Sequence, residues 1–206
     1  DLTGLNKWVW IVSHIFTDSK FMALFSILFG AGIILFTGKR ETKGLKSGGL
    51  HYRRTFWLLL IGLVHAYLLW YGDILVVYAL CALLIFLYRK LSPKVLLILG
   101  FCSIAVPSIL FILFGSSISL WPPEAQQNML MGWKPAADII QAEIAAYRGG
   151  WLDQMAHRVP ASLKFHLFIY FIYMGWRAGG LMLAGMALYK WKVLTAKLSR
   201  AGTRKL

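Results

Sequence analysis

Charged residues are scarce in this chain, and acidic residues are the scarcest of them. Only 8 Asp and Glu residues stand against 22 Lys and Arg residues in 206, and all charged residues together make up 15%. Hydrophobic residues make up 59%. An ordinary soluble domain has about 25% charged residues. This composition therefore excludes that class and favours an integral membrane protein.

Cysteine is also scarce, and familiar catalytic motifs are absent. Cys81 and Cys102 both lie inside apolar runs, which argues against a structural disulfide and favours a packing role. His51 and His157 have no metal-ligand spacing. The sequence contains no C-x-x-C, H-E-x-x-H, P-loop or G-x-S-x-G motif. We therefore predict no metal site.

The basic residues are grouped, and their grouping predicts the topology. Fifteen of the 22 fall in the clusters 39–54, 89–94 and 190–205, which contain one acid, Glu41. Lys and Arg are retained on the cytoplasmic side during membrane insertion. We therefore expect the net charge of +14 to lie on the cytoplasmic face, against anionic lipid headgroups rather than nucleic acid.

Long apolar runs lie between the basic clusters. A membrane-spanning helix needs about 20 apolar residues. Spans are predicted at 21–37, 55–71, 74–88, 95–120 and about 166–189. Residues 8–16 are too short to span and predict an interfacial segment. The fold class is thus an all-α, polytopic helical bundle with about five transmembrane helices plus interfacial helices, in a single membrane domain, 1–206.

The one sizeable polar segment, 121–164, is predicted to lie outside the cytoplasm by alternation of the spans. Pro at the first turn and a broad apolar side predict a helix at 135–147 that lies on the outer membrane surface. A second short turn is expected near Trp151 and Met155. The predicted location is a bacterial inner (plasma) membrane, multi-pass, with cytoplasmic basic loops.

The fifth predicted span carries a polar stripe. His166, Tyr170, Tyr173 and Arg177 follow one another at i, i+4, i+7 and i+11, within about 60° on an α-helix. A cation near mid-bilayer is costly unless it is paired or hydrated. We therefore expect the stripe to line a substrate channel in the protein, although snorkelling of Arg177 and anchoring by the tyrosines remain an alternative.

The same span is rich in small residues. Gly175 and Gly179 form a G-x-x-x-G pattern, and Gly180 and Gly185 extend the small surface. Such patterns allow helix backbones in membranes to approach closely. We therefore predict close helix packing at these glycines.

His65 and Asp73 are the best candidates for proton chemistry. An intramembrane His is a candidate proton carrier or general base. On a continuous helix the two residues would be separated by about 12 Å of rise, so they meet only if the turn between them folds back. Asp73 is expected to cap the following helix, with roles as a base partner or cation site left open. A neutral, hydrogen-bonded packing role for His65 also stays open.

Four further residues are weaker candidates. Lys20 lies at the outer face, where it can pair with Asp73, and His14 lies just outside the first span. Arg53 and Arg54 could grip an anionic cytoplasmic ligand, although a role as topology determinants alone also explains them.

Three stretches together resemble a known family. They are K-F-x-x-L-F-S-x-L-F-G-A-G from Lys20, G-D-I-L-x-x-Y-A-L from Gly72, and the run from Arg177 to Tyr189. The chain resembles the YeiB-like family of bacterial inner-membrane proteins, the domain-of-unknown-function family numbered 418. Members usually start with a further helix carrying an Arg-Gly motif and continue with more helices. The resemblance thus implies that this chain, which opens at Asp1, is part of a longer protein.

The resemblance implies a function only through architecture. The family is similar in architecture to membrane acyltransferases of the heparan N-acetyltransferase type, which pass an acyl group from cytoplasmic acyl-CoA to an acceptor outside. Those enzymes use a His on the extracytoplasmic side, but their motif has no residue-by-residue match here. His65 and His14 are therefore candidates by position, with Asp73 orienting the base and Arg53 and Arg54 holding CoA phosphates.

Two other functions stay open, and so does the assembly state. A permease or ion-coupled transporter would use the polar residues as a substrate or proton path, although no inverted repeat is visible. A membrane scaffold or assembly subunit would use them to hold helices together. Acyl-CoA is the possible donor substrate, the identity of any cofactor stays open, and the chain can be a monomer or a homo-oligomer.

Overall fold

The computed structural model describes residues 3–17 and 20–195, and these are all-α, without a β-strand in either range. In chain order the α-helices are α1 (Gly4–Phe16), α2 (Lys20–Glu41), α3 (Gly48–Val64), α4 (Leu75–Ile85), α5 (Pro93–Ser117), α6 (Pro123–Trp133), α7 (Ala137–Arg148), α8 (Trp151–Lys164) and α9 (Gly175–Lys190). Two π-helices, η1 (His65–Leu69) and η4 (Phe165–Met174), and two 3₁₀-helices, η2 (Phe86–Lys90) and η3 (Ile118–Leu120), continue them.

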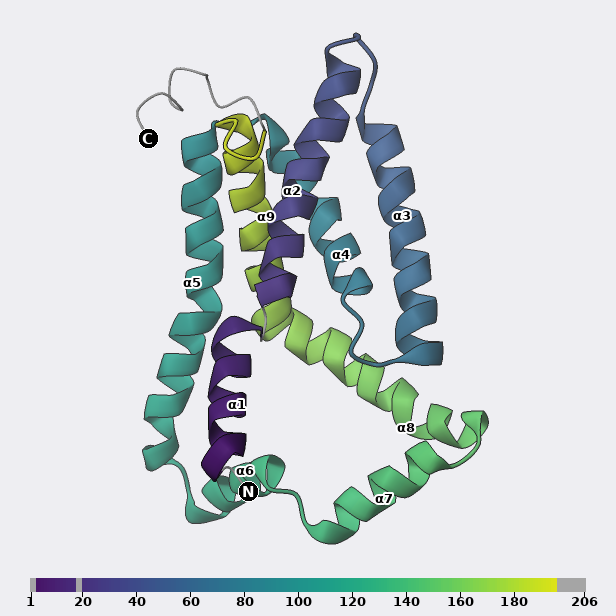
Figure 1. The fold of residues 1–206 in the computed structure, drawn as a ribbon, viewed down its shortest axis with the longest axis vertical. Helices are drawn as coiled ribbons and strands as arrows, with labels where there is room; N and C mark the ends of the chain where they lie inside the picture. The colour runs from purple at the N-terminus through teal and green to yellow at the C-terminus, as the bar shows by residue number, and fades with distance from the viewer. Residues whose placement is uncertain (1–2, 18–19, 196–206) are drawn as a thin grey trace.

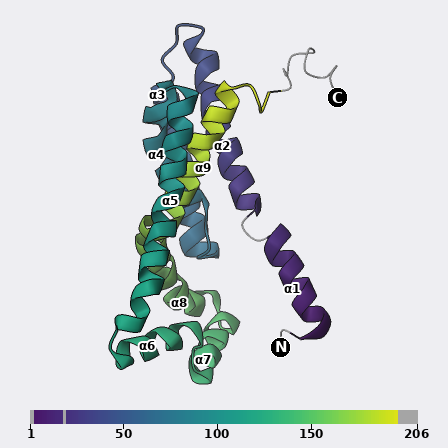
Figure 2. The same cartoon turned by 90° about the vertical axis from the view of Figure 1, so that its left-hand side faces the viewer.

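Helices α2, α3, α4, α5 and α9 form a bundle in which α2, α4 and α9 run in one direction and α3 and α5 run in the other (Figures 1 and 2). Helix α9 is its centre, because α2, α5 and α4 all pack against it. The buried core includes Val77 and Ala82 of α4, Met182 and Met186 of α9, and Leu96 of α5. Many apolar side chains on the outside of the rods are exposed, as expected where lipid replaces water.

The basic connectors gather at one end of the bundle. The α2–α3 loop, the start of α5 and the end of α9 lie together, whereas α6 and α7 lie at the opposite end (Figure 1). This arrangement agrees with the predicted alternation of the rods. Residues 196–206, which include most of the third basic cluster, lie outside the described residues.

Three helical stretches in the described chain are long and apolar enough to cross a membrane. They are Gly4–Glu41, Pro93–Leu120 and Trp151–Lys190. Helices α3 and α4 are not among these membrane-length stretches, for different reasons. Helix α3 has Arg53 and Arg54 in its first turns, and the 11-residue α4 with the 5-residue η2 is shorter than the about 20 residues that a span needs. The membrane character is therefore clear, and a count of five spans stays a prediction.

The polar segment contains more helix than the sequence indicated. The helix predicted at 135–147 is α7, Ala137–Arg148. The short turn expected near Trp151 is instead the 14-residue α8, which continues without a break into η4 and α9. Helix α8 slants from the end of α7 to the bundle (Figure 1). Its polar residues therefore reach the bundle, where the sequence predicted a surface segment.

Glycines set the helix crossings, but mostly not those of the G-x-x-x-G pattern. A Cβ at Gly30 would overlap the carbonyl oxygen of Met182, and one at Gly185 would overlap that of Ile27. At Gly180 it would lie 2.6 Å from the carbonyl oxygen of Gly100. A Cβ at Gly179, by contrast, would make only ordinary contacts. Close approach of α9 to α2 and α5 thus depends on Gly180 and Gly185 and their partners.

Candidate functional site

The candidate site begins at the C-terminal end of α3, where the α-helix becomes a π-helix. Helix α3 gives way to the π-helix η1 at His65, and the backbone becomes extended at Trp70. A Cβ at Gly72 would lie 2.7 Å from the Trp70 ring, so glycine at this position lets the ring lie close against the tight turn. At this turn the chain folds back toward α3, which brings the carboxylate of Asp73 close to His65. Single π-helical turns of this kind occur often at functional sites.

His65 and Asp73 meet across this turn. The distance between His65 Nδ1 and Asp73 Oδ1 is 2.8 Å. The other carboxylate oxygen of Asp73 accepts a hydrogen bond of 2.7 Å from the backbone N–H of Val76, as the capping prediction required. The Asp73 side chain is fully buried, whereas that of His65 is 36% exposed. The fold-back that the sequence left as a condition therefore occurs.

This geometry can support general base chemistry. A buried carboxylate that accepts the Nδ1 proton fixes the imidazole orientation and leaves Nε2 as the basic nitrogen. It also stabilises the imidazolium that forms when Nε2 takes a proton. Because the carboxylate is held on both oxygens and the imidazole is partly exposed, the pair presents a supported base at an accessible face.

Helix α8 holds the π-helix in place. Arg158 donates through Nη1 to the carbonyl oxygen of Leu68 at 2.6 Å, and Ser162 donates to that of Ala66 at 2.7 Å. Trp151 Nε1 also donates to Leu68 at 3.2 Å. Both Arg158 and Ser162 are buried. They bind carbonyls of the turn that precedes Asp73, and thereby fix the position of the dyad.

Sequence reasoning missed Arg158 and Ser162. The only available signal was their spacing of one helical turn on α8, which any amphipathic helix shows. Their partners lie about ninety residues earlier in the chain, and no local pattern encodes that contact.

His166 continues the same row, one turn after Ser162. Its ring is buried, its centroid lies 5.8 Å from that of Tyr67, and neither ring nitrogen has a hydrogen-bond partner among the described residues. Near α8, the Tyr147 hydroxyl of α7 is likewise buried and unpartnered there, and burial raises the pKa of this phenol. Unpaired buried polar groups are costly and are a reason to look for function.

The predicted stripe on the fifth span does not form one polar face. The π-helix η4 has a longer repeat than an α-helix, so residues spaced for 3.6 per turn spread around it. His166 contacts Tyr67 of η1, and Tyr173 contacts the Phe111 ring of α5. Arg177, which is half-buried, donates to the Tyr173 hydroxyl.

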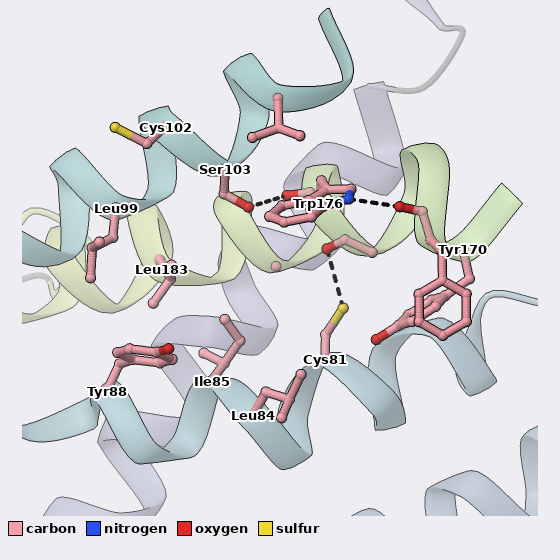
Figure 3. A pocket seen from close by; sticks show the side chains of 14 residues that line it. Cys81, Leu84, Ile85, Tyr88, Leu99, Cys102, Ser103, Tyr170, Trp176 and Leu183 are labelled. Carbon is pink, nitrogen blue, oxygen red and sulfur yellow. Dashed lines mark hydrogen bonds between the residues drawn. The ribbon is translucent and has the colours of Figure 1, made fainter. Parts of the chain in front are cut away.

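Tyr170 lines a separate apolar cavity of about 450 Å³ between α4, α5 and α9 (Figure 3). Cys81 Sγ donates there to the carbonyl oxygen of Gly175 at 3.5 Å, and Ser103 donates to that of Trp176 at 2.8 Å. Trp176 Nε1 donates to the carbonyl oxygen of Phe171 at 2.7 Å. These bonds hold the backbone where η4 meets α9, which indicates a structural role for Cys81, Ser103 and Trp176.

His14 and Lys20 belong to other elements. His14 lies on α1 and stacks on Trp10 with a centroid distance of 4.9 Å, and α1 lies away from the α3–α4 turn in both views (Figures 1 and 2). Lys20 is the first residue of α2. The two carboxylate oxygens of Asp73 contact His65 and Val76, and its pairing with Lys20 stays a prediction.

Arg53 and Arg54 lie near the start of α3 and are exposed, at the end of the bundle that carries the basic connectors. Arg54 lies over the Phe36 ring of α2, 4.1 Å from its centroid. It also borders a groove between α2 and α3, whereas Arg53 is not among the groove residues. In the described part of the chain, no group of three or more His, Cys, Asp or Glu side chains is placed to hold a metal ion.

Comparison with known proteins gives relatives but no activity. The "Uncharacterized protein YeiB" of Escherichia coli (strain K12) is 27% identical over 190 residues, which is 92% of this chain and 46% of YeiB. The chain is homologous to YeiB. The "Uncharacterized protein YxaH" of Bacillus subtilis (strain 168) is 46% identical over 83 residues, 40% of this chain and 21% of YxaH.

A third relative, the "Uncharacterized 39.9 kDa protein in amylase 3'region" of Bacillus acidopullulyticus, is 36% identical over 87 residues, 42% of this chain and 25% of that protein. The chain thus spans about half or less of the length of YeiB and these other relatives. No family model matches it, and no solved structure matches it.

Proposed function

We propose that the chain is one membrane domain, 1–206, of a transmembrane acyltransferase that uses the His65–Asp73 pair as its base. Five spans in a bacterial inner membrane would leave the basic connectors in the cytoplasm and residues 121–164 outside. The positive charge of the connectors supports this orientation. The observation that carries the proposal is the 2.8 Å contact between a partly exposed imidazole and a fully buried carboxylate.

The chemistry needs a donor and an acceptor, both of them substrates. His65 Nε2 removes the proton from an acceptor hydroxyl or amine as that group attacks the thioester carbonyl of acyl-CoA. The tetrahedral intermediate collapses to the acylated acceptor and the CoA thiolate. His65 then returns its proton to the thiolate, so no net proton is lost. Asp73 keeps the imidazole oriented throughout.

The donor would enter from the cytoplasmic end. Arg53 and Arg54 would hold its phosphates, and Arg54 is eleven residues from His65, about 16 Å of helical rise on nearly the same face of α3. This places the thioester arm along the helix toward the dyad. On the acceptor side we assign His166, Lys20, Tyr170, Tyr173 and Arg177 to the channel as separate polar positions, because the residues of η4 do not share one face. His14 is the second candidate base.

We expect His65→Ala to lower acyl-CoA turnover by the full-length protein at least about 100-fold, because that is the usual contribution of a general base. The same variant should keep the thermal stabilisation by CoA, whereas Arg53→Ala/Arg54→Ala should lose it. His157→Ala is the matched control, since His157 is similarly exposed and pairs with Glu143 on α7. Free CoA released in detergent and the CoA-dependent melting temperature measure the two effects.

Two results would replace this proposal. If saturating CoA or acetyl-CoA causes no shift in the melting temperature, acyl-CoA is excluded as the donor substrate. Substrate flux in proteoliposomes that is lost in Arg177→Leu would favour a permease or ion-coupled transporter. If the protein shows neither CoA binding nor substrate flux, a scaffold or assembly subunit is the function that stays open.

A further inference from the structure

A second site lies between α2 and α3 and borders the buried core at Ile33. The two helices border a groove of about 650 Å³ whose walls are mainly apolar, and every lining residue comes from these two helices. Leu35, Trp57 and Ile61 are among its walls and are 42%, 58% and 57% exposed. The groove therefore opens sideways along the bundle, in the direction where a membrane supplies lipid chains.

One end of the groove is basic. Lys39 of α2 and Arg54 of α3 both line it, and no Asp or Glu is among its lining residues in the described chain. Arg54 is held at this end by its contact with the Phe36 ring. The nearest acid in sequence, Glu41, is bound to Ser47 at 2.7 Å and Arg89 at 3.2 Å. The groove thus joins apolar walls to a two-cation rim.

We infer that this groove binds an anionic glycerophospholipid of the cytoplasmic leaflet. Its phosphate lies between Lys39 and Arg54, and one acyl chain lies along the apolar walls toward Ile61. Charge complementarity selects the ligand, because that leaflet is rich in anionic headgroups and each nearby Lys or Arg strengthens binding to them. A free phosphate would leave the apolar walls unfilled. This inference does not require acyl transfer, and it competes with the proposed function for Arg54, which can hold a lipid phosphate or the CoA phosphates but not both at once.

The test is lipid retention by the full-length protein in native mass spectrometry, with equal amounts of phosphatidylglycerol and phosphatidylcholine. The wild type should retain phosphatidylglycerol preferentially. Arg54→Gln should lower that preference about fivefold, since one interfacial cation contributes roughly 1 kcal/mol. Lys39→Gln should act in the same direction. Arg53→Gln is the matched control, because Arg53 is an exposed neighbour outside the groove.

Filling the apolar wall tests the chain-binding part. Ile61→Trp should lower retention of both lipids without removing the preference for phosphatidylglycerol. Equal retention of the two lipids by the wild type, or equal loss in Arg53→Gln and Arg54→Gln, would overturn the inference. Displacement of phosphatidylglycerol by acyl-CoA that depends on Arg54 would also overturn it and assign the groove to the donor. His65→Ala should leave retention unchanged, so failure of the acyl-transfer proposal is seen separately.

Discussion

Replacing Gly30 or Gly185 by Ala is expected to destabilise the bundle by roughly 3 kcal/mol or more, at the upper end of overpacking effects. The added Cβ would overlap a backbone carbonyl of the facing helix, of Met182 or of Ile27, so relief requires α2 and α9 to move apart. This crossing supports the central helix of the bundle. Thermal unfolding in detergent, followed by loss of the monodisperse peak, measures the effect.

Gly32→Ala provides the control for this prediction. Gly32 lies on the same helix, and a Cβ there meets nothing within 4 Å. Because Ala also favours helix over Gly, this variant should be neutral or slightly stabilised. Equal melting temperatures for Gly30→Ala and Gly32→Ala would contradict the close crossing of α2 and α9.

Asp73 is the residue whose loss should affect both stability and activity. Asp73→Ala removes the cap on Val76 and the partner of His65, and we expect a loss of about 2–4 kcal/mol. Asp73→Asn keeps an oxygen that can accept from Val76 but loses the charge, so its stability loss should be about half as large. If the proposed chemistry holds, both variants should lose at least about 100-fold in acyl-CoA turnover.

The measurements for Asp73 are the melting temperature and the CoA-release rate of the full-length protein. Asp138→Asn is the control, since Asp138 is an exposed carboxylate in the first turn of α7. Wild-type turnover in Asp73→Asn would remove Asp73 from the mechanism while leaving its capping role intact.

Hydropathy and charge predicted the long apolar helices, and they predicted that the basic connectors lie together at one end of the bundle. These features depend on composition over about 20 residues, and bilayer thickness constrains that length. The helix at α7 was predicted for the same reason, from an apolar side on an otherwise polar segment. The capping role of Asp73 was also predictable, because a carboxylate just before a helix meets free N–H groups.

The site itself needed the structure. A continuous helix would separate His65 from Asp73, and they meet because the chain leaves the helix at Trp70 and folds back. The same assumption placed Tyr170 on one face with Arg177 across η4, whereas Tyr170 lines a separate cavity and Arg177 contacts Tyr173. The contact of Arg158 with Leu68 joins distant parts of the chain, and nothing local indicates it. Likewise, a G-x-x-x-G pattern does not say which helix it faces.

The two π-helices belong to one region of the molecule. Helix α8 packs against η1 and continues directly into η4. Each π-helical stretch has backbone carbonyls bound by side chains, Leu68 by Arg158 and Phe171 by Trp176. Irregular helix is tolerated at membrane depth where protein groups satisfy the backbone. This shared irregularity, next to the dyad, is a physical reason to look for function there.

The account depends most on the orientation of the bundle, which cysteine accessibility tests directly. In a background with Cys81 and Cys102 replaced by Ala, single cysteines at Lys46, Lys94 and Gln126 report the α2–α3 loop, the start of α5, and α6. An impermeant maleimide should label Gln126→Cys in intact spheroplasts, and Lys46→Cys and Lys94→Cys only after permeabilisation. Labelling of Lys46→Cys and Lys94→Cys from opposite sides of the intact membrane would contradict the account.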